Sequence, residues 1–138
     1  MYLVDTNVIS KSRKGTRANA GVREFFERTA VHQAAPYLSV VTIGELRRGV
    51  EVIRHRGDKV QAKQLEKWLE QLVKHYDDYI LDVDPDVAQL WGRLRVPHHE
   101  NALDKLIAAT ALIHDLTVVT RNQTDFAKTG VTVINPFS

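Results

Sequence analysis

Four acidic side chains lie where chain folding could bring their carboxylates together. Asp5 directly follows the apolar run 2–4, and Glu45 comes shortly after a second apolar run. Asp104 lies in an Ala- and Leu-rich segment, and Asp125 follows a third apolar run. Two carboxylates about 4 Å apart repel by about 4 kcal/mol at an effective dielectric constant of 20. A cluster of such groups must therefore take up protons or bind a cation.

The residue types favour a hard divalent cation at such a cluster. Carboxylate oxygens prefer magnesium or manganese. The chain has no cysteine, and no histidine neighbours any of the four acids in sequence, which argues against zinc. One or two Mg²⁺ ions with open water positions are typical of phosphoryl transfer, because the metal lowers the pKa of bound water and stabilises charge on the phosphate oxygens.

Polar neighbours of the acids are candidates for holding them in position. Thr6 and Thr120 carry hydroxyls that can donate hydrogen bonds to carboxylates, and Asn7 can orient a water or a backbone group. Turn and strand-end roles explain these three residues almost as well. Asn122 is a further polar candidate near Asp125, and both could also be solvated turn residues.

A basic segment lies close to Asp5 in the sequence. Residues 11–17 contain four positive charges and no acid, although the whole chain has a formal net charge of only +2. Candidate contacts to RNA phosphates are Lys11, Arg13, Lys14, Arg17 and Arg47. Phosphate contacts supply affinity and position rather than sequence choice. Ordinary solvated surface charge is the alternative interpretation.

Short apolar runs alternate with helical patterns along the chain. The predicted strands are 2–4, 37–41, 79–83, 117–120 and 131–134. The predicted helices are 21–30, 42–56, 58–76, 84–94 and 102–114. Residues 5–7 are expected to form a turn, and residues 11–17 a mobile loop or a frayed helix end. Thr42 and Glu45 fit a capping box that opens the second helix, which gives Glu45 a purely structural alternative role.

This alternation predicts an α/β fold with three layers, in which helices cover both faces of a central parallel sheet of about five strands. Sites in such sheets lie at the carboxyl ends of the strands, near the point where the strand order reverses. The length of 138 residues predicts one domain, 1–138. No apolar run is long enough to span a membrane, and the N-terminus does not have the pattern of a signal peptide, so we expect a cytoplasmic protein without membrane contact.

The motifs around these acids resemble those of the PIN-domain family. The resemblance rests on the opening segment 5–10 and on segments 43–49, 103–111 and 120–126, which occur in the family's order, and the ending 135–137 also fits. It covers the whole chain and is nearest to the VapC-like toxins of bacterial toxin–antitoxin pairs. Lys105 departs from the pattern, because a small residue is common after the third acid.

The resemblance implies a magnesium-dependent endoribonuclease, with manganese as a possible substitute. It implies that Asp5, Glu45, Asp104 and Asp125 form the metal site and act in catalysis, and it leaves open whether Asp125 or Asn122 is the fourth group that faces the metal. It also implies an RNA substrate such as tRNA or rRNA, a cognate antitoxin protein that inhibits the enzyme, and a homodimer. Promoter DNA would be bound only through the antitoxin.

Two other classes of function stay open on the residues alone. A receiver-like signalling domain would also be a small parallel α/β fold, with Asp82 or Asp84 as its phosphorylated residue. A binding module could keep the fold and lack the chemistry. The segment 98–100, His-His-Glu, lacks the spacing of a helical zinc pair and is expected to be an exposed loop.

Overall fold

The computed structural model describes all residues, 1–138, as short strands alternating with helices. The strands are β1 (Tyr2–Val4), β2 (Leu38–Ser39), β3 (Ile80–Leu81), β4 (Thr117–Val119) and β5 (Val133–Ile134). The α-helices are α1 (Thr6–Ser12), α2 (Ala20–Val31), α3 (Val40–His55), α4 (Lys59–His75), α5 (Pro85–Leu94), α6 (Ala102–Ile113) and α7 (Gln123–Phe126). Two 3₁₀ turns span Gly15–Arg17 and Asp77–Tyr79.

All strand pairs in the molecule are parallel. One sheet has the order β1-β4-β5, and the other pairs β2 with β3. A bridge between Leu3 and Tyr37 joins them, because Val4 N donates to Tyr37 O and Tyr37 N donates to Tyr2 O. The five strands therefore follow the order β3-β2-β1-β4-β5. The predicted parallel α/β class is confirmed, although the regular strands are shorter than the apolar runs that predicted them.

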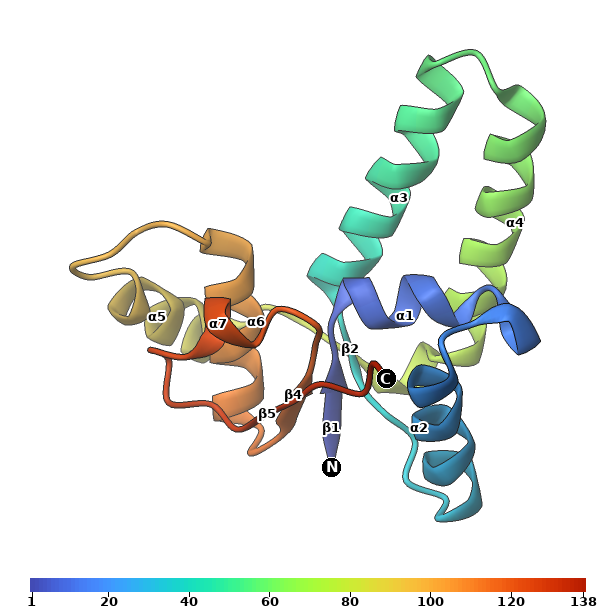
Figure 1. Ribbon diagram of the computed structural model, residues 1–138. Helices are drawn as coiled ribbons and strands as arrows, with labels where there is room; N and C mark the ends of the chain where they lie inside the picture. Colours follow the sequence, from blue (N-terminus) through green and yellow to red (C-terminus); the bar gives the residue numbers. More distant parts are fainter.

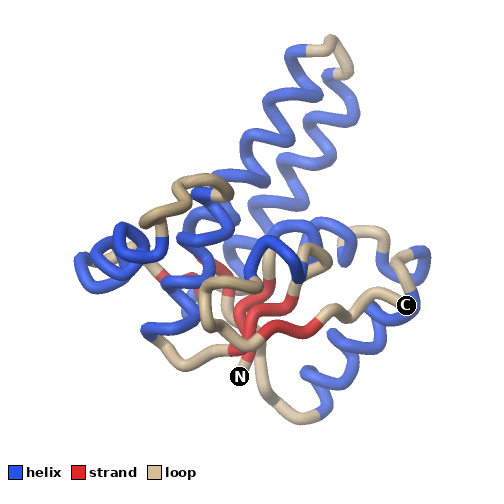
Figure 2. The backbone as a smooth tube through the Cα atoms, turned by 60° about the vertical axis from the view of Figure 1, so that its left-hand side comes forward, coloured by secondary structure: helices blue, strands red, loops and turns tan.

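The two faces of the sheet bury different sets of helices, as the two-residue period of a strand requires. Leu3 of β1 and Val118 of β4 pack with the apolar side of α6. Their neighbours Val4 and Val119 point the other way and pack with helices α1 to α4. Figure 1 shows α5, α6 and α7 on one side of the strands and α1 to α4 on the other. The strands lie at the centre in Figure 2 as well, which confirms the three-layer arrangement.

Helices α3 and α4 form a long hairpin that extends beyond the rest of the molecule (Figures 1 and 2). Their exposed faces are joined by ion pairs, in which Arg47 Nη1 lies 2.6 Å from Glu66 Oε2 and Arg54 Nη2 lies 3.2 Å from the same oxygen. Arg47 also pairs with Glu51 at 3.4 Å. Arg47, a predicted RNA contact, therefore forms ion pairs with carboxylates of its own hairpin.

The start of α3 differs from the prediction in a way that matters for the site. Strand β2 ends at Ser39, whose hydroxyl caps the helix by accepting from Val41 N at 3.0 Å. The predicted capping box of Thr42 and Glu45 is wrong, because both residues already lie inside the helix. The earlier cap leaves the Glu45 carboxylate free for other partners.

The segment after β1 also differs from the prediction. Residues 6–12 form helix α1 rather than a turn that leads into a loop, and Asp5 is its N-cap. The 3₁₀ turn Gly15–Arg17 follows. Asp58 caps α4 and Asp84 caps α5, and residues 98–100 are exposed outside any helix, as expected for an exposed loop. No helix combines the length and the apolar character needed to cross a membrane.

Candidate active site

The strand order reverses at β1, and this places the candidate site. The chain runs from β1 outward through β2 to β3, and then crosses back to β4 on the other side of β1. Because the strands are parallel, the segments that follow β1, β2 and β4 meet at one edge of the sheet. These segments carry Asp5, Glu45 and Thr120, as the sequence predicted.

Asp5 is buried and fully engaged in hydrogen bonds. The residue is only 4% exposed and lies at the junction of β1 and α1. Oδ1 accepts from Thr6 N at 2.8 Å, and Oδ2 accepts from Thr120 Oγ1 at 2.8 Å and from Asn7 Nδ2 at 3.3 Å. Burial raises the pKa of Asp5 above its usual range, against the opposing effect of the bonds from Thr120 and Thr6, and the charge of Asp125 raises it further.

Asn7 and Thr120 join the end of β1 to the end of β4. Asn7 Nδ2 donates to Thr120 Oγ1 at 3.3 Å, and Asn7 Oδ1 accepts from Arg121 N at 3.1 Å. Thr120 Oγ1 in turn accepts from Asn122 N at 3.0 Å. The two side chains fix the orientation of the Asp5 carboxylate and the path of the chain after β4.

Thr6 holds Glu45. The Thr6 hydroxyl donates to Glu45 Oε1 at 2.8 Å and lies 3.2 Å from the hydroxyl of Thr42. Thr42 was not among the predicted site residues. Its position three residues before Glu45, on the same face of α3, is the sequence signal that could have indicated this role.

Asp104 and Asp125 complete the group of acids. Burial raises the pKa of Asp104 to about 6, and the charges of Asp5, Asp125 and Glu45 raise it too. A hydrogen bond with Asp125 acts in the same direction. Asp104 is therefore influenced by the charges of the other three predicted acids. Asp125 is half-buried, whereas Asn122 is exposed and joins the site through its backbone N–H, which donates to Thr120 Oγ1.

The chemistry of this donor set suits a divalent cation, although its geometry is incomplete. No three His, Asp or Glu side chains are already arranged as a closed metal site. The acids are nevertheless hard oxygen donors, and burial, with a further contribution from neighbouring carboxylates, raises the pKa values of Asp5 and Asp104. A bound Mg²⁺ or Mn²⁺ would relieve the repulsion between these carboxylates, so the residues fit the ion.

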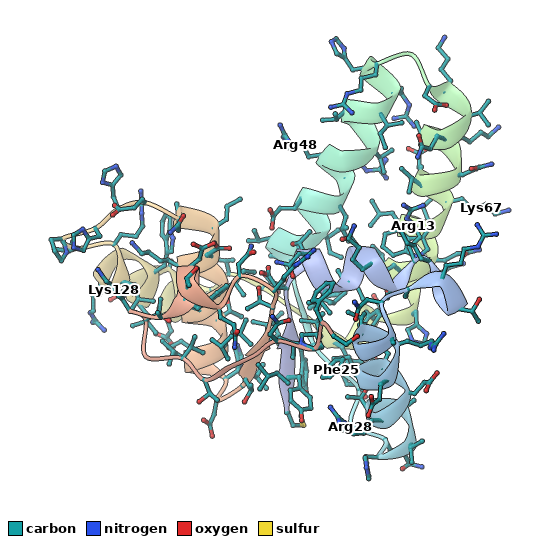
Figure 3. The ribbon with its side chains drawn as sticks, viewed as in Figure 1. Arg13, Phe25, Arg28, Arg48, Lys67 and Lys128 are labelled. Atoms are coloured by element: carbon teal, nitrogen blue, oxygen red, sulfur yellow. The ribbon has the colours of Figure 1, made fainter.

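A pocket of about 270 Å³ opens beside Glu45, between α1, α3 and α4. Thr6 and Glu45 line it together with the predicted RNA contacts Lys11, Arg13 and Lys14. Figure 3 shows Arg13 between α1 and the α3–α4 hairpin. The fourth cation of the basic segment, Arg17, is exposed and lies outside this pocket.

Replacing Thr120 by valine is expected to destabilise the protein by about 2 kcal/mol, because Asp5 Oδ2 loses a donor and the Asn122 amide loses its acceptor. Thr110→Val is the matched control. Thr110 is equally buried, but its hydroxyl donates only to the Leu106 carbonyl of its own helix. Urea unfolding measures both, and an equal loss in the two variants would contradict the role of Thr120.

Comparison with known proteins identifies the family. Residues 2–131 match the PIN domain family. The chain is a PIN-domain protein. The resemblance seen in the sequence is thereby confirmed, and the receiver-like alternative loses its support. Asp84 is in any case engaged as the cap of α5, next to the edge strand β3.

The relatives and the solved structure reported next match between 70% and 100% of this chain. The chain is 35% identical over 143 residues to Toxin FitB of Neisseria gonorrhoeae, covering 99% of each protein. It is 33% identical over 106 residues to Ribonuclease VapC4 of Mycobacterium tuberculosis, covering 70% of this chain and 74% of the relative. A solved structure of FitAB bound to an IR36 DNA fragment superposes with a TM-score of 0.85 and 31% identity, covering 100% of this chain and 96% of that one.

Proposed function

We propose that this PIN-domain protein is a magnesium-dependent endoribonuclease and the toxin of a VapBC-like type II toxin–antitoxin pair. The observation that carries the proposal is the convergence of acids at the carboxyl edge of a parallel sheet, where Thr120 and Thr6 hold Asp5 and Glu45. Burial and the neighbouring carboxylates raise the pKa of Asp104 there. Similarity to a protein named Ribonuclease VapC4 supports cleavage of RNA by such a site.

Asp5, Glu45, Asp104 and Asp125 would hold the ion, with one or two Mg²⁺ bound and Mn²⁺ as a possible replacement. The ion supplies a Lewis acid that activates water and stabilises charge on the phosphate. Thr6 and Thr120 fix the carboxylates of Glu45 and Asp5 through their hydroxyl donors. Attack by water on phosphorus, with the ribose 3′-oxygen as leaving group, would leave a 5′-phosphate and a 3′-hydroxyl. Attack by the ribose 2′-hydroxyl would instead expel the 5′-oxygen.

The RNA strand would approach along the pocket that contains Lys11, Arg13 and Lys14. These cations lie beside Glu45, one of the proposed metal ligands, so their charge compensates RNA phosphates next to the reacting one. Because such contacts do not read bases, the choice between tRNA and rRNA would depend on shape and unpaired loops.

The proposed partners follow the same family relationship. Similarity to Toxin FitB, and to the structure titled FitAB bound to a DNA fragment, supports a cognate antitoxin protein as partner. Promoter DNA would then be bound only through that antitoxin. We further propose a homodimer that acts on RNA in the cytoplasm.

A cleavage assay on antitoxin-free protein tests the proposed function. Total cellular RNA is incubated with the protein in Mg²⁺ or in EDTA, and the ends of the fragments are sequenced. We expect discrete fragments with 5′-phosphates in Mg²⁺ alone. Intact RNA in every condition, with protein shown to be folded by circular dichroism, would instead support the alternative of a binding module without catalytic activity.

A further inference from the structure

A second pocket lies on the other side of the acids from the basic α1 segment. It has a volume of about 360 Å³ and is formed where the loop before α6 meets α7. Lys105, Lys128 and His98 are the basic residues in its wall, and the acids in its wall are Asp125 and Glu100. Asp125 is therefore shared between this pocket and the candidate active site.

Lys105 is the unusual residue of this pocket. It is only 7% exposed, and no carboxylate lies within 4 Å of its ammonium group. Its single hydrogen bond runs from Nζ to the backbone carbonyl of His98. An ammonium group has three donors, so two are left for a ligand. A hydrogen bond from its own backbone lowers the pKa of Glu100, and the charges of His98 and Lys105 lower it further. Because no carboxylate contacts the Lys105 ammonium, its two remaining donors are available to a partner outside the chain.

The surrounding groups favour an anionic partner that offers several oxygens. Glu100 is a competing acid in the pocket wall, and its carboxylate lies 3.4 Å from His98 Nδ1 and 3.8 Å from His99 Nδ1. The pocket also includes Asn101 at the start of α6, where no side chain caps the helix. The amides of that first turn are thus open to a further acceptor.

We propose that this pocket binds the RNA phosphate next to the one that is cleaved, with Lys105 as its principal contact and Lys128 at its rim. The proposal rests on the proposed ribonuclease function. The shared residue Asp125 makes the pocket continuous with the acids, so that a strand lying across them can place a neighbouring phosphate against Lys105.

The positions of the two pockets give the strand a path across the molecule. The pocket with Lys11, Arg13 and Lys14 shares Glu45 with the acids, and the pocket with Lys105 shares Asp125. Figure 3 shows Arg13 and Lys128 on opposite sides of the strands. The acids therefore lie between two basic pockets, as a site that cuts within a chain requires.

Binding of a short fluorescein-labelled single-stranded RNA, measured by anisotropy in EDTA over a range of salt concentrations, tests the proposal without cleavage. Lys105→Met keeps the apolar stem and removes the charge. We expect about tenfold weaker binding and a slope of log K against log salt that is smaller by about one. Lys105→Arg should retain most of the affinity, and Lys63→Met on the exposed face of α4 should change nothing.

A substrate with one uncharged methylphosphonate identifies the phosphate concerned. Placed next to the mapped cleavage site, it should slow cleavage by wild type about tenfold and cause no additional loss with Lys105→Met. Unchanged RNA binding by a folded Lys105→Met protein would overturn the proposal, even if wild type cleaves RNA.

If Lys105→Met does not fold, Lys128→Gln at the exposed rim of the pocket is the second variant. It is expected to weaken RNA binding about threefold, and unchanged binding by this variant would also overturn the proposal. Absence of both cleavage and binding in wild type would instead reject the ribonuclease function itself.

Discussion

Replacing Asp5 by asparagine is expected to lower the rate of RNA cleavage at least about a thousandfold while the fold is kept. The amide oxygen can still accept from Thr6 N and cap α1, but the negative charge that would hold the cation is lost. Steady-state cleavage rates at saturating Mg²⁺, with thermal unfolding of the same samples, measure both effects.

Asp5→Ala separates the loss of charge from the loss of the cap. It should be equally inactive, and it should also be less stable by about 1 kcal/mol because the N-cap of α1 is removed. Asp58→Ala is the matched control, since Asp58 caps α4 by accepting from Gln61 N at 3.0 Å far from the acids. It should lose similar stability and retain full activity. An active Asp5→Asn protein would contradict the assigned role.

In the metal-free protein, we expect ionisation of Asp104 to lower the free energy of unfolding as the pH rises. The pKa of this carboxyl rises from 3.8 to about 6 on folding, so the folded state binds its proton more tightly than the unfolded state. Stability from this group is therefore present below about pH 4 and is lost as the pH rises through 6. A shift of about two pKa units corresponds to about 3 kcal/mol, which partial exposure reduces to about 2 kcal/mol.

Urea unfolding of wild type and Asp104→Asn in EDTA isolates this contribution. The variant should be more stable than wild type by about 2 kcal/mol at pH 7.5, and the two should converge toward pH 4. Saturating Mg²⁺ should stabilise wild type at pH 7.5 and leave the variant nearly unchanged. A wild type that is the more stable of the two in EDTA at pH 7.5 would show that the carboxylates do not repel one another.

The fold class was predictable because strands buried on both faces have a distinctive pattern. Segments such as 2–4 and 117–120 are continuous apolar runs separated by helical patterns, and this implies a parallel sheet with two covered faces. Helix α1 could not be predicted in the same way. Its sequence, Thr-Asn-Val-Ile-Ser-Lys-Ser, contains residues that favour turns and strands, and it forms because Asp5 caps it and Val8 and Ile9 are buried in the core.

Asp5, Glu45 and Asp125 were predictable as candidates because they follow strands of a parallel sheet, whereas Asp104 stood out as an acid in an Ala- and Leu-rich segment. The contacts of these acids were not predictable, because they depend on where each helix begins. The cap at Ser39 rather than Thr42 turns Glu45 from an expected capping partner into an acceptor for Thr6. Lys105 appeared in the sequence only as a departure from the family pattern, and its burial beside Asp125 emerges from the packing of the loop before α6 against α7.

Titration of the metal-free protein with Mg²⁺ in a calorimeter at pH 7.5 tests most directly whether the acids form a cation site. We expect saturable binding of one or two ions. A parallel titration at pH 6, near the pKa of Asp104, should also release protons as the ion displaces them, whereas little release is expected at pH 7.5. Asp5→Asn and Asp104→Asn should each lose most of that binding, whereas Asp58→Asn should bind as wild type does. Wild type that binds no Mg²⁺, or variants that bind it equally well, would contradict a metal-dependent nuclease built on these four carboxylates.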